Sequence, residues 1–457
     1  MGRLRLAMFT PLPPQPTGVG DYMRDLLPAL IALADVDVFI DDYAHDATSV
    51  PAPCGVYPHR EFLVRRADAP YDCVIYHLGN SPFHRYLYPY AARFPGVAVL
   101  HDHVLHHLLA GMAEEGGSGF YFREMAYNAG TTGVRAAWEA LMTHTEVPFY
   151  QYPLNRRILD VSLGIAVHSD YLRTLIEKEA PEGPVARIPM GMPLPTVDGD
   201  PLALRAVLRI PPARFVVGSF GQATAQKRIP QVLQAVAGLA SRGADIHYLI
   251  VGSVGAELDV LTTVERLGLQ GRVTVTGYVD ETTFNACLQA VNVCVNLRYP
   301  TAGETSAAAL RCMAAGRPTI VTGVGANLEF ADEACLKLPA GPQEVPMLER
   351  VLQALLDAPE ARQHLGRGAR AYVQREHSLA AAASGMASFV ERCLSPGQLG
   401  AEKETYSPSP LLKEVAERLN SVGVTAQEVP LMADLARALV FVDGTTDHST
   451  ALSGAAL

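Results

Sequence analysis

The segment "YPTAGETSAAALRCMAAGRPTIVT" places polar side chains where an apolar strand is followed by an Ala-rich helix. Thr305 and Ser306 stand at the expected start of this helix, where backbone N–H groups and hydroxyls can hold an anion. Glu304 would repel a phosphate, so we interpret its carboxylate as an acceptor of hydrogen bonds from ligand hydroxyls. The alternative is a purely structural one, since a carboxylate in the first turn also complements the helix dipole.

A second segment, "SFGQATAQKRIPQVLQAV", combines a strand, a glycine and two cations. The strand ends at Gly221, and Lys227 and Arg228 follow at the entrance of the next helix. Cations beside a helix N-terminus can form charge-assisted hydrogen bonds to diphosphate oxygens that gain charge during bond cleavage. The alternative is a solvated helix start.

Glycines follow the first strand in "TPLPPQPTGVGDYMRDL". Gly18 and Gly20 would let the backbone approach a phosphate closely at the start of a helix. The pattern is not a dinucleotide fingerprint, because a proline-rich loop precedes the pair and no third glycine follows at the required spacing. A plain glycine turn remains the alternative.

Histidines and an acidic residue follow another strand in "VLHDHVLHHLLAG". His101 and Asp102 fall at the carboxyl end of the strand, where they can hydrogen-bond a substrate hydroxyl. His103 and His107 have the i, i+4 spacing of metal ligands, but no acidic or cysteine partner has a matching spacing. We therefore expect no metal site here.

The segment "VTGYVDETTF" has Gly277 and Tyr278 directly after a strand. This arrangement suits a backbone-lined slot for a nucleobase, although a strand followed by a glycine turn would look the same.

These candidate residues follow short apolar strands, and the strands alternate with helical segments. The first half has expected strands at 5–9, 36–40, 73–78, 97–100, 163–167 and 185–188, and the second half at 215–220, 247–252, 272–277, 293–297 and 318–322. Continuous apolar strands separated by helices predict parallel sheets covered on both faces. Ligands bind beyond the carboxyl ends of such strands. The sequence thus predicts an α/β protein with two doubly wound, Rossmann-like domains.

The domain boundaries follow from composition. We predict a first domain over 1–190, a second over 191–377, a closing helix over 378–395, and a linker with a helical extension over 396–457. The hinge is expected at "IPMGMPLPTVDGDP" (188–201), where prolines and glycines interrupt the periodicity.

Composition excludes several classes of protein. The 457 residues are too many for one core, and 49% hydrophobic with 18% charged residues is ordinary for a folded chain. A net charge of −10 argues against nucleic-acid binding. The seven cysteines are scattered and odd in number, which favours a reducing cytoplasm over a disulfide framework. No signal-like or membrane-spanning run is apparent, which leaves peripheral membrane association and homo-oligomerisation open.

Together these segments resemble the GT-B glycosyltransferases, specifically the retaining family-4 type (glycosyl transferases group 1). The resemblance covers roughly residues 5–393 and rests on "TGVGDY", "HSDYL", "IPMG", "GQATAQK", "LIVGSVG", the stretch from "VTGYVDETTF" to "GRPTIVT", and "YVQREHS".

The resemblance implies a role for each candidate residue. Lys227 would bind the donor diphosphate, Gly18 and Gly20 would approach it from the first domain, and Thr305 and Ser306 would add backbone donors. Gly277 and Tyr278 would lie near the base, Glu304 would hold sugar hydroxyls, and His101 would line the acceptor or sugar side of the cleft.

Two departures from the family pattern stand out. The family commonly has two glutamates eight positions apart at this turn, whereas this chain has Gly303 and Arg311 at those positions and Glu304 is displaced by one. The usual arginine after the glycine is replaced by Gln222, which makes Lys227 the surer diphosphate ligand.

The resemblance implies a retaining hexosyltransferase that uses a nucleotide-diphosphate sugar as donor, needs no cofactor or metal, and lets the leaving diphosphate act as base. A nucleotide-sugar hydrolase, an epimerase, a phosphorylase and a non-catalytic nucleotide-sugar sensor remain alternatives. The donor base, the sugar and the acceptor stay open, as does the role of residues 110–157, where Arg123, Tyr127, Trp138 and Tyr150 offer either sugar stacking or packing.

Overall fold

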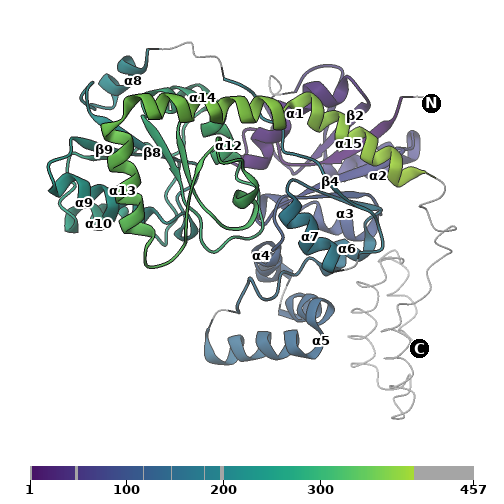
Figure 1. The fold of residues 1–457 in the computed structure, drawn as a ribbon. Helices are drawn as coiled ribbons and strands as arrows, with labels where there is room; N and C mark the ends of the chain where they lie inside the picture. The colour runs from purple at the N-terminus through teal and green to yellow at the C-terminus, as the bar shows by residue number, and fades with distance from the viewer. Residues whose placement is uncertain are drawn as a thin grey trace, which may run out of the picture.

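A computed structural model of the chain describes residues 3–46, 50–116, 118–145, 147–179, 181–195 and 200–395. Two parallel sheets lie side by side, each flanked by helices (Figure 1). The expected linker and helical extension over 396–457 lies outside the described residues. None of the described helices is both long and apolar enough to cross a membrane.

The first sheet has seven strands in the order β3-β2-β1-β4-β5-β6-β7. Its strands are β1 (Arg5–Phe9), β2 (Asp35–Ile40), β3 (Gly55–Pro58), β4 (Cys73–Leu78), β5 (Val97–Leu100), β6 (Gly164–Val167) and β7 (Val185–Arg187). Strand β1 is central: Phe9 pairs with Phe39 on one side and with Tyr76 on the other. The apolar runs therefore form parallel strands because both faces of the sheet are buried.

Helices cover this sheet on both sides. They are α1 (Gly18–Ile31), α2 (Phe62–Asp68), α3 (Tyr88–Arg93), α4 (His106–Gly116), α5 (Ser118–Thr143), α6 (Arg156–Val161) and α7 (Asp170–Lys178), with short 3-10 turns η2 (His59–Glu61) and η3 (Pro82–His84). Helix α1 begins where the Thr17 hydroxyl accepts the Val19 N–H. Helix α5 is interrupted at Gly130, which has a φ of +57°.

The second sheet has six strands in the order β10-β9-β8-β11-β12-β13. They are β8 (Phe215–Phe220), β9 (Ile246–Val251), β10 (Val273–Val275), β11 (Val293–Asn296), β12 (Thr319–Thr322) and β13 (Leu336–Leu338). Its helices are α8 (Pro201–Val207), α9 (Ile229–Ser241), α10 (Val260–Arg266), α11 (Glu281–Ala290), α12 (Ala307–Ala314), α13 (Glu344–Asp357) and α14 (Pro359–Glu376), with turns η4 (Ala225–Lys227) and η5 (Gly325–Glu329).

Helix α15 (Leu379–Leu394) returns from the second domain to pack on the first (Figure 1). Gly164 lies so close to it that a Cβ at this position would collide with the Cys393 sulfur. One apolar cluster joins the domains, because residues of β1 and α1 pack with residues of α12, α14 and α15. All seven cysteines are free thiols.

The chain between the domains is tied to the end of α14. The Met192 N–H donates to the His377 carbonyl over 2.8 Å, and the His377 Nδ1 donates to the Met190 carbonyl over 2.8 Å. Residues 191–195 have no regular secondary structure, as the prolines and glycines indicate.

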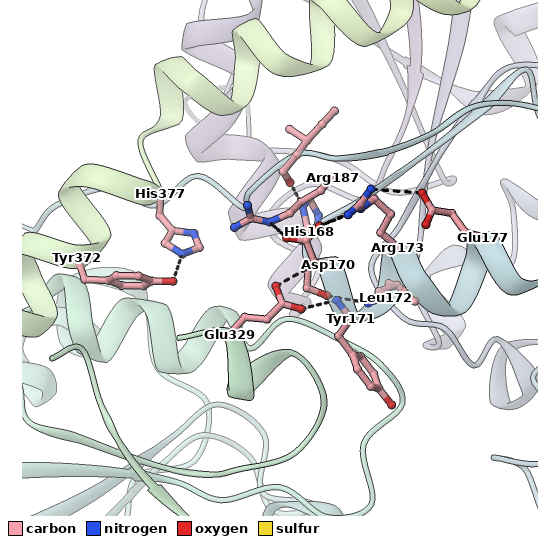
Figure 2. A network of polar contacts seen from close by, with 12 residues as sticks. His168, Asp170, Tyr171, Leu172, Arg173, Glu177, Arg187, Glu329, Tyr372 and His377 are labelled. Atoms are coloured by element: carbon pink, nitrogen blue, oxygen red, sulfur yellow. Dashed lines mark hydrogen bonds and ion pairs between the residues drawn. The ribbon is translucent and has the colours of Figure 1, made fainter. Parts of the chain in front are cut away.

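Hydrogen bonds between the second domain and the first fix how the two domains meet. The carboxylate of Glu329, from η5, accepts the N–H groups of Asp170 (2.9 Å) and Tyr171 at the start of α7 (Figure 2). An anion at a helix N-terminus is stabilised by the orphan N–H groups there. The second domain thus caps a helix of the first.

Candidate active site

The Lys227 side chain lies at the carboxyl end of β8. Its Nζ donates to the Phe220 carbonyl over 3.0 Å. Gly221, with a φ of +82°, turns the chain here, and a Cβ at this position would lie only 2.8 Å from the Lys227 Nζ. A glycine at 221 therefore gives the amine room to reach the end of the strand.

The Lys227 amine is poised to receive an anion. Burial, and to a lesser extent the nearby charge of Arg298, lowers its pKa to about 7. The negative charge of an incoming diphosphate would oppose both effects, because it stabilises the protonated amine and offsets Arg298. The arrangement therefore favours a ligand with clustered negative charge.

Arg298 and Glu304 form an ion pair beside Lys227. The guanidinium of Arg298 contacts Glu304 Oε1, and Glu304 Oε2 accepts the Thr301 hydroxyl over 3.1 Å. Only 10% of the Glu304 side chain is exposed, and the Arg298 Nε is buried with no partner among the described residues. The carboxylate expected to meet ligand hydroxyls is thus held by a cation, and part of that cation still lacks an acceptor.

The two hydroxyls at the start of α12, those of Ser306 and Thr305, differ in their hydrogen bonding. Ser306 is the N-cap: its Oγ accepts the Ala309 N–H over 3.2 Å and donates to Asn296 Oδ1 over 2.9 Å. The Thr305 Oγ is buried without a partner among the described residues. A buried hydroxyl left unpaired is costly, so Thr305 is the hydroxyl that remains for a ligand.

Asp102 faces this group from the first domain. Its Oδ2 accepts the Asn80 N–H over 2.8 Å. Burial raises the pKa of Asp102, and the negative charge of Glu304 raises it further. The carboxyl groups of Asp102 and Glu304, which come from different domains, are therefore close enough to repel each other electrostatically.

A backbone contact between the domains brings these carboxyl groups together. The His103 N–H donates to the Ala302 carbonyl over 2.7 Å. Gly303 has a φ of +89°, and a Cβ there would lie 2.7 Å from the His103 Cβ. The glycine allows the turn before α12 to press against the loop after β5.

His101 directly follows β5 and is 6% exposed. Its Nε2 lies 3.1 Å from the Nδ1 of His77, and its ring is 4.9 Å from that of His168. Burial lowers the pKa of His101 well below its ordinary value. It is a neutral ring at physiological pH, beside Asp102.

The glycines of α1 contribute space. A Cβ on Gly18 would meet nothing within 4 Å, whereas one on Gly20 would lie 3.3 Å from the Thr17 side chain. Gly20 is thus explained by packing, and Gly18 is the one that faces open space.

Gly277 and Tyr278 follow β10, at the turn that leads into α11. Gly277 has a φ of +72°, and Tyr278 is 62% exposed. Burial of its partly covered ring raises the pKa of Tyr278, and Asp21 on α1 raises it further, which places the ring opposite α1. Gln222 is exposed at the carboxyl end of β8.

Two ion pairs join α1 to the second domain. Arg24 lies 2.9 Å from Glu281 Oε2 on α11, and Arg311 on α12 lies 3.2 Å from Asp25 Oδ2. Arg311, which stands where the resemblance in sequence would place a glutamate, thus bridges the two domains.

A cavity of about 490 Å³ lies beside Arg311. Residues from the hinge, α8 and α11 line the rest of it: Pro193, Leu194, Pro195, Asp200, Pro201, Glu281, Thr282, Asn285, Ala286 and Gln289. Among the residues that line this cavity Arg311 is the one cation, whereas Lys227 and Arg298 lie together with the unpartnered Thr305 hydroxyl. We therefore take the group around Lys227 as the candidate site.

The histidine pair with metal-ligand spacing is divided between different partners. His103 Nε2 contacts Glu179 Oε1 over 2.5 Å, and His107 Nδ1 contacts the Asn80 amide over 2.7 Å. Among the described residues, a grouping of possible metal ligands occurs elsewhere, at Asp41, Asp42 and His59.

Sequence reasoning missed Arg298 and gave Tyr150 no position. Arg298 stands two residues after β11, so the rule of inspecting residues that follow parallel strands could have found it. The Tyr150 side chain hydrogen-bonds Gln226, and the charges of Glu304 and Asp102 act on its phenol. Nothing in the spacing of the sequence could have placed this tyrosine at the cleft.

Comparisons with known proteins agree with this architecture. Residues 213–357 match the family model described as glycosyl transferases group 1. The chain is 27% identical to an alpha-D-kanosaminyltransferase over 42% of its length, and 31% identical to a 2-deoxystreptamine glucosyltransferase over 32%, both from Streptomyces kanamyceticus. The matches span 50% and 37% of those curated relatives.

The fold has solved counterparts over most of the chain. The Anabaena protein HepE, in complex with UDP and glucose, superposes with a TM-score of 0.59 at 16% identity, over 85% of this chain and all of that one. The chain therefore has the GT-B fold, and its second domain carries the sequence pattern of the glycosyl transferases group 1.

Proposed function

We propose that this chain is a glycosyltransferase that moves a sugar from a nucleotide-diphosphate sugar to an acceptor hydroxyl. The observation that carries the proposal is the group formed by Lys227, Arg298 and the start of α12. It offers two cations, an unpaired hydroxyl and helix N–H groups at one place in a GT-B cleft. The group 1 family match and both curated relatives support the same activity.

In this proposal Lys227 and the N–H groups of Thr305 and Ser306 bind the diphosphate. As the bond between the sugar C1 and the diphosphate oxygen breaks, negative charge grows on that oxygen. Lys227 takes up a proton on binding and stabilises the charge, and Arg298 adds a second cation. Such preorganised donors contribute several kcal/mol to transition-state stabilisation.

We further propose retention of configuration without a metal ion. The acceptor oxygen attacks C1 from the face that the diphosphate leaves, and its proton passes to the departing phosphate oxygen. The ion pair between Glu304 and Arg298 supports this mechanism, because a carboxylate held by a guanidinium is a poor nucleophile. His101 and Glu304 then orient the sugar.

For the donor we propose a UDP-sugar, since HepE was solved in complex with UDP and glucose. For the acceptor we propose an amino-substituted polyol, because one relative is a 2-deoxystreptamine glucosyltransferase. The facing carboxyl groups of Asp102 and Glu304 favour an ammonium group at this cleft.

The test incubates the protein with UDP-, GDP- and ADP-sugars, each with and without a panel of aminocyclitols and neutral polyols, in the presence of a chelator. We expect the release of nucleoside diphosphate to depend on the acceptor. We also expect a donor with an axial bond at the sugar C1 to give a product with an axial bond at C1. Equal release without acceptor would identify a hydrolase instead. Binding without turnover, unchanged in a Lys227→Ala variant, would identify a sensor.

A further inference from the structure

Buried imidazoles gather at the carboxyl ends of neighbouring strands in the first domain. His77 lies in β4, His101 directly follows β5, and His168 directly follows β6. The rings of His77 and His101 are 5.3 Å apart, and the Tyr22 ring packs edge-on against His101 at 5.9 Å. His101 is the member of this group placed beside Asp102 at the cleft.

Backbone carbonyls set the tautomer of two neighbouring rings. His84 Nδ1 lies 2.9 Å from the His77 carbonyl, and His168 Nδ1 lies 2.9 Å from the Ile188 carbonyl. A carbonyl only accepts, so both Nδ1 atoms carry hydrogen. Burial lowers the pKa of each ring to about 4, so each is neutral and its Nε2 is a bare acceptor.

No carbonyl determines which nitrogen carries the hydrogen in the His77–His101 contact. His77 Nδ1 and His101 Nε2 are 3.1 Å apart, so one nitrogen donates and the other accepts. His77 is fully buried, and its Nε2 has no partner among the described residues. If His101 donated, the hydrogen of His77 would sit on this Nε2 as a buried N–H without an acceptor.

Donation from His77 to His101 leaves a less costly unpaired atom. If His77 donates from Nδ1, its Nε2 keeps only an unpaired acceptor. Orphaned buried N–H groups are rarer in proteins than under-satisfied acceptors. The hydrogen of His101 must then be on Nδ1, a nitrogen that neither bonds to a described residue nor belongs to the buried unpartnered atoms.

We propose that His77 is a positioning residue that donates to His101 and holds it as the Nδ1–H tautomer, with this N–H offered to the ligand. The inference rests on the proposed function for the statement that His101 faces the sugar. It assigns His101 as a hydrogen-bond donor to a ligand oxygen and leaves it no role as general base. Proton acceptance by the leaving phosphate agrees with this assignment.

The direct test is ¹⁵N NMR of the full chain labelled at histidine, since ring nitrogen shifts and two-bond couplings distinguish the tautomers. The His101 signals are assigned by their loss in a His101→Gln variant. We expect a protonated Nδ1 and an unprotonated Nε2 in the wild-type protein. A protonated Nε2 on His101 would overturn the proposal. This readout needs no activity, so it fails or succeeds independently of the proposed reaction.

Matched variants connect the tautomer to turnover. His77→Asn keeps an N–H donor near the Nδ1 position, whereas His77→Leu removes it. We expect His77→Leu to mix the tautomers of His101 and lower kcat by about tenfold or more, with unchanged affinity for the nucleoside diphosphate. His77→Asn should retain the wild-type tautomer and most of the kcat.

The control is His247→Leu, a buried strand histidine in the second domain that contacts Thr274 Oγ1 over 2.9 Å. It should lose stability without any change in the His101 signals. Equal losses of kcat in His77→Asn and His77→Leu, with the His101 signals unchanged in both, would show that His77 acts through packing alone.

Discussion

At the scale of single residues, charge balance around Lys227 governs the proposed reaction. The free amine has a pKa lowered to about 7 by burial and by Arg298, so it is largely neutral at pH 8. A bound diphosphate would favour the charged form. Binding should therefore draw a proton from solution.

Replacing Lys227 by Arg tests this coupling. At pH 8 we expect the wild-type protein to take up nearly one proton more than Lys227→Arg on binding a nucleoside diphosphate, because arginine is always charged. Above pH 7 the wild-type affinity should fall by up to about tenfold per pH unit, and that of the variant should fall less. Calorimetry in buffers of different ionisation enthalpy measures both. Identical proton uptake in the two proteins would contradict the role of Lys227.

Glu304→Gln separates diphosphate binding from sugar handling. The substitution removes a negative charge that offsets Arg298, so nucleoside diphosphate affinity should rise by about fivefold. Turnover should fall by about tenfold, since a ligand hydroxyl loses a charged acceptor. Calorimetric and steady-state measurements give the two numbers.

The matched control is Glu177→Gln, an exposed carboxylate on α7 that pairs with Arg173. It should change neither affinity nor turnover. Weaker nucleoside diphosphate binding by Glu304→Gln would show that Arg298 does not serve the phosphates.

The residues of the site were only partly predictable. Lys227 and Thr305 follow strands at recognisable turns, so their positions can be read from the chain. The ion pair between Arg298 and Glu304 depends on how the turn between β11 and α12 folds, and the proximity of Asp102 depends on how the two domains meet. The residue types alone do not show that Arg298 folds back onto Glu304, so the sequence predicted only a carboxylate that accepts hydrogen bonds from ligand hydroxyls.

At the scale of elements, α1 is the part of the first domain that is joined by ion pairs to α11 and α12. Asp25 accepts from Arg24 at 2.8 Å and from Arg311 at 3.2 Å, and only 11% of its side chain is exposed. The loss of this carboxylate would leave Arg311 without an ion pair among the described residues, whereas Arg24 would keep Glu281 and Asp21. The closure of the cleft therefore depends on a contact that the donor site does not use directly.

Asp25→Asn should loosen the closed arrangement. We expect a loss of about 1–3 kcal/mol in stability and a larger radius of gyration by small-angle X-ray scattering. Glu177→Gln again serves as control, because an exposed pair contributes about 0–1 kcal/mol. Scattering and stability indistinguishable from wild type would show that the ion pair does not hold the domains.

The elements themselves were largely predictable because long apolar runs identify buried parallel strands. Strands β3 and β13 were missed: they are four and three residues long and lie at the sheet edges. Their sequences, GVYP and LKL, interrupt the apolar run with a glycine and a proline or with a lysine, so they carry little apolar signal. The N-terminus of α7 is capped by Glu329 from the other domain, and the sequence around α7 does not predict this contact.

At the scale of the whole molecule, the GT-B fold and the likeness to the glycosyl transferases group 1 were predicted and are confirmed. The order of strands and glycine turns along the chain was sufficient for this. The specific donor and acceptor were not predictable, because they depend on side chains contributed by both domains.

The buried histidines make the first domain sensitive to acid. Burial lowers the pKa of His77 to about 3 and of His168 to about 4. The unfolded chain would protonate these rings near their ordinary pKa of 6.5, so it binds more protons than the folded chain at pH 4–6. Stability is thus complete above about pH 6.5 and is lost as the pH falls, by up to about 1.4 kcal/mol per pH unit for each ring.

Urea unfolding at pH 7.5, 6.5 and 5.5 measures this loss, with the Tyr fluorescence or circular dichroism of the intact chain as readout. His168→Gln should flatten the dependence on pH, since one titrating ring is removed. A slope that is the same in this variant and the wild type would show that the ring does not titrate on unfolding.

The most direct measurement is a crystal structure of the protein with a nucleoside diphosphate. We expect the terminal phosphate within about 3 Å of the Lys227 Nζ and of the Thr305 and Ser306 N–H groups. A diphosphate bound instead in the cavity beside Arg311 and Pro193 would contradict the account.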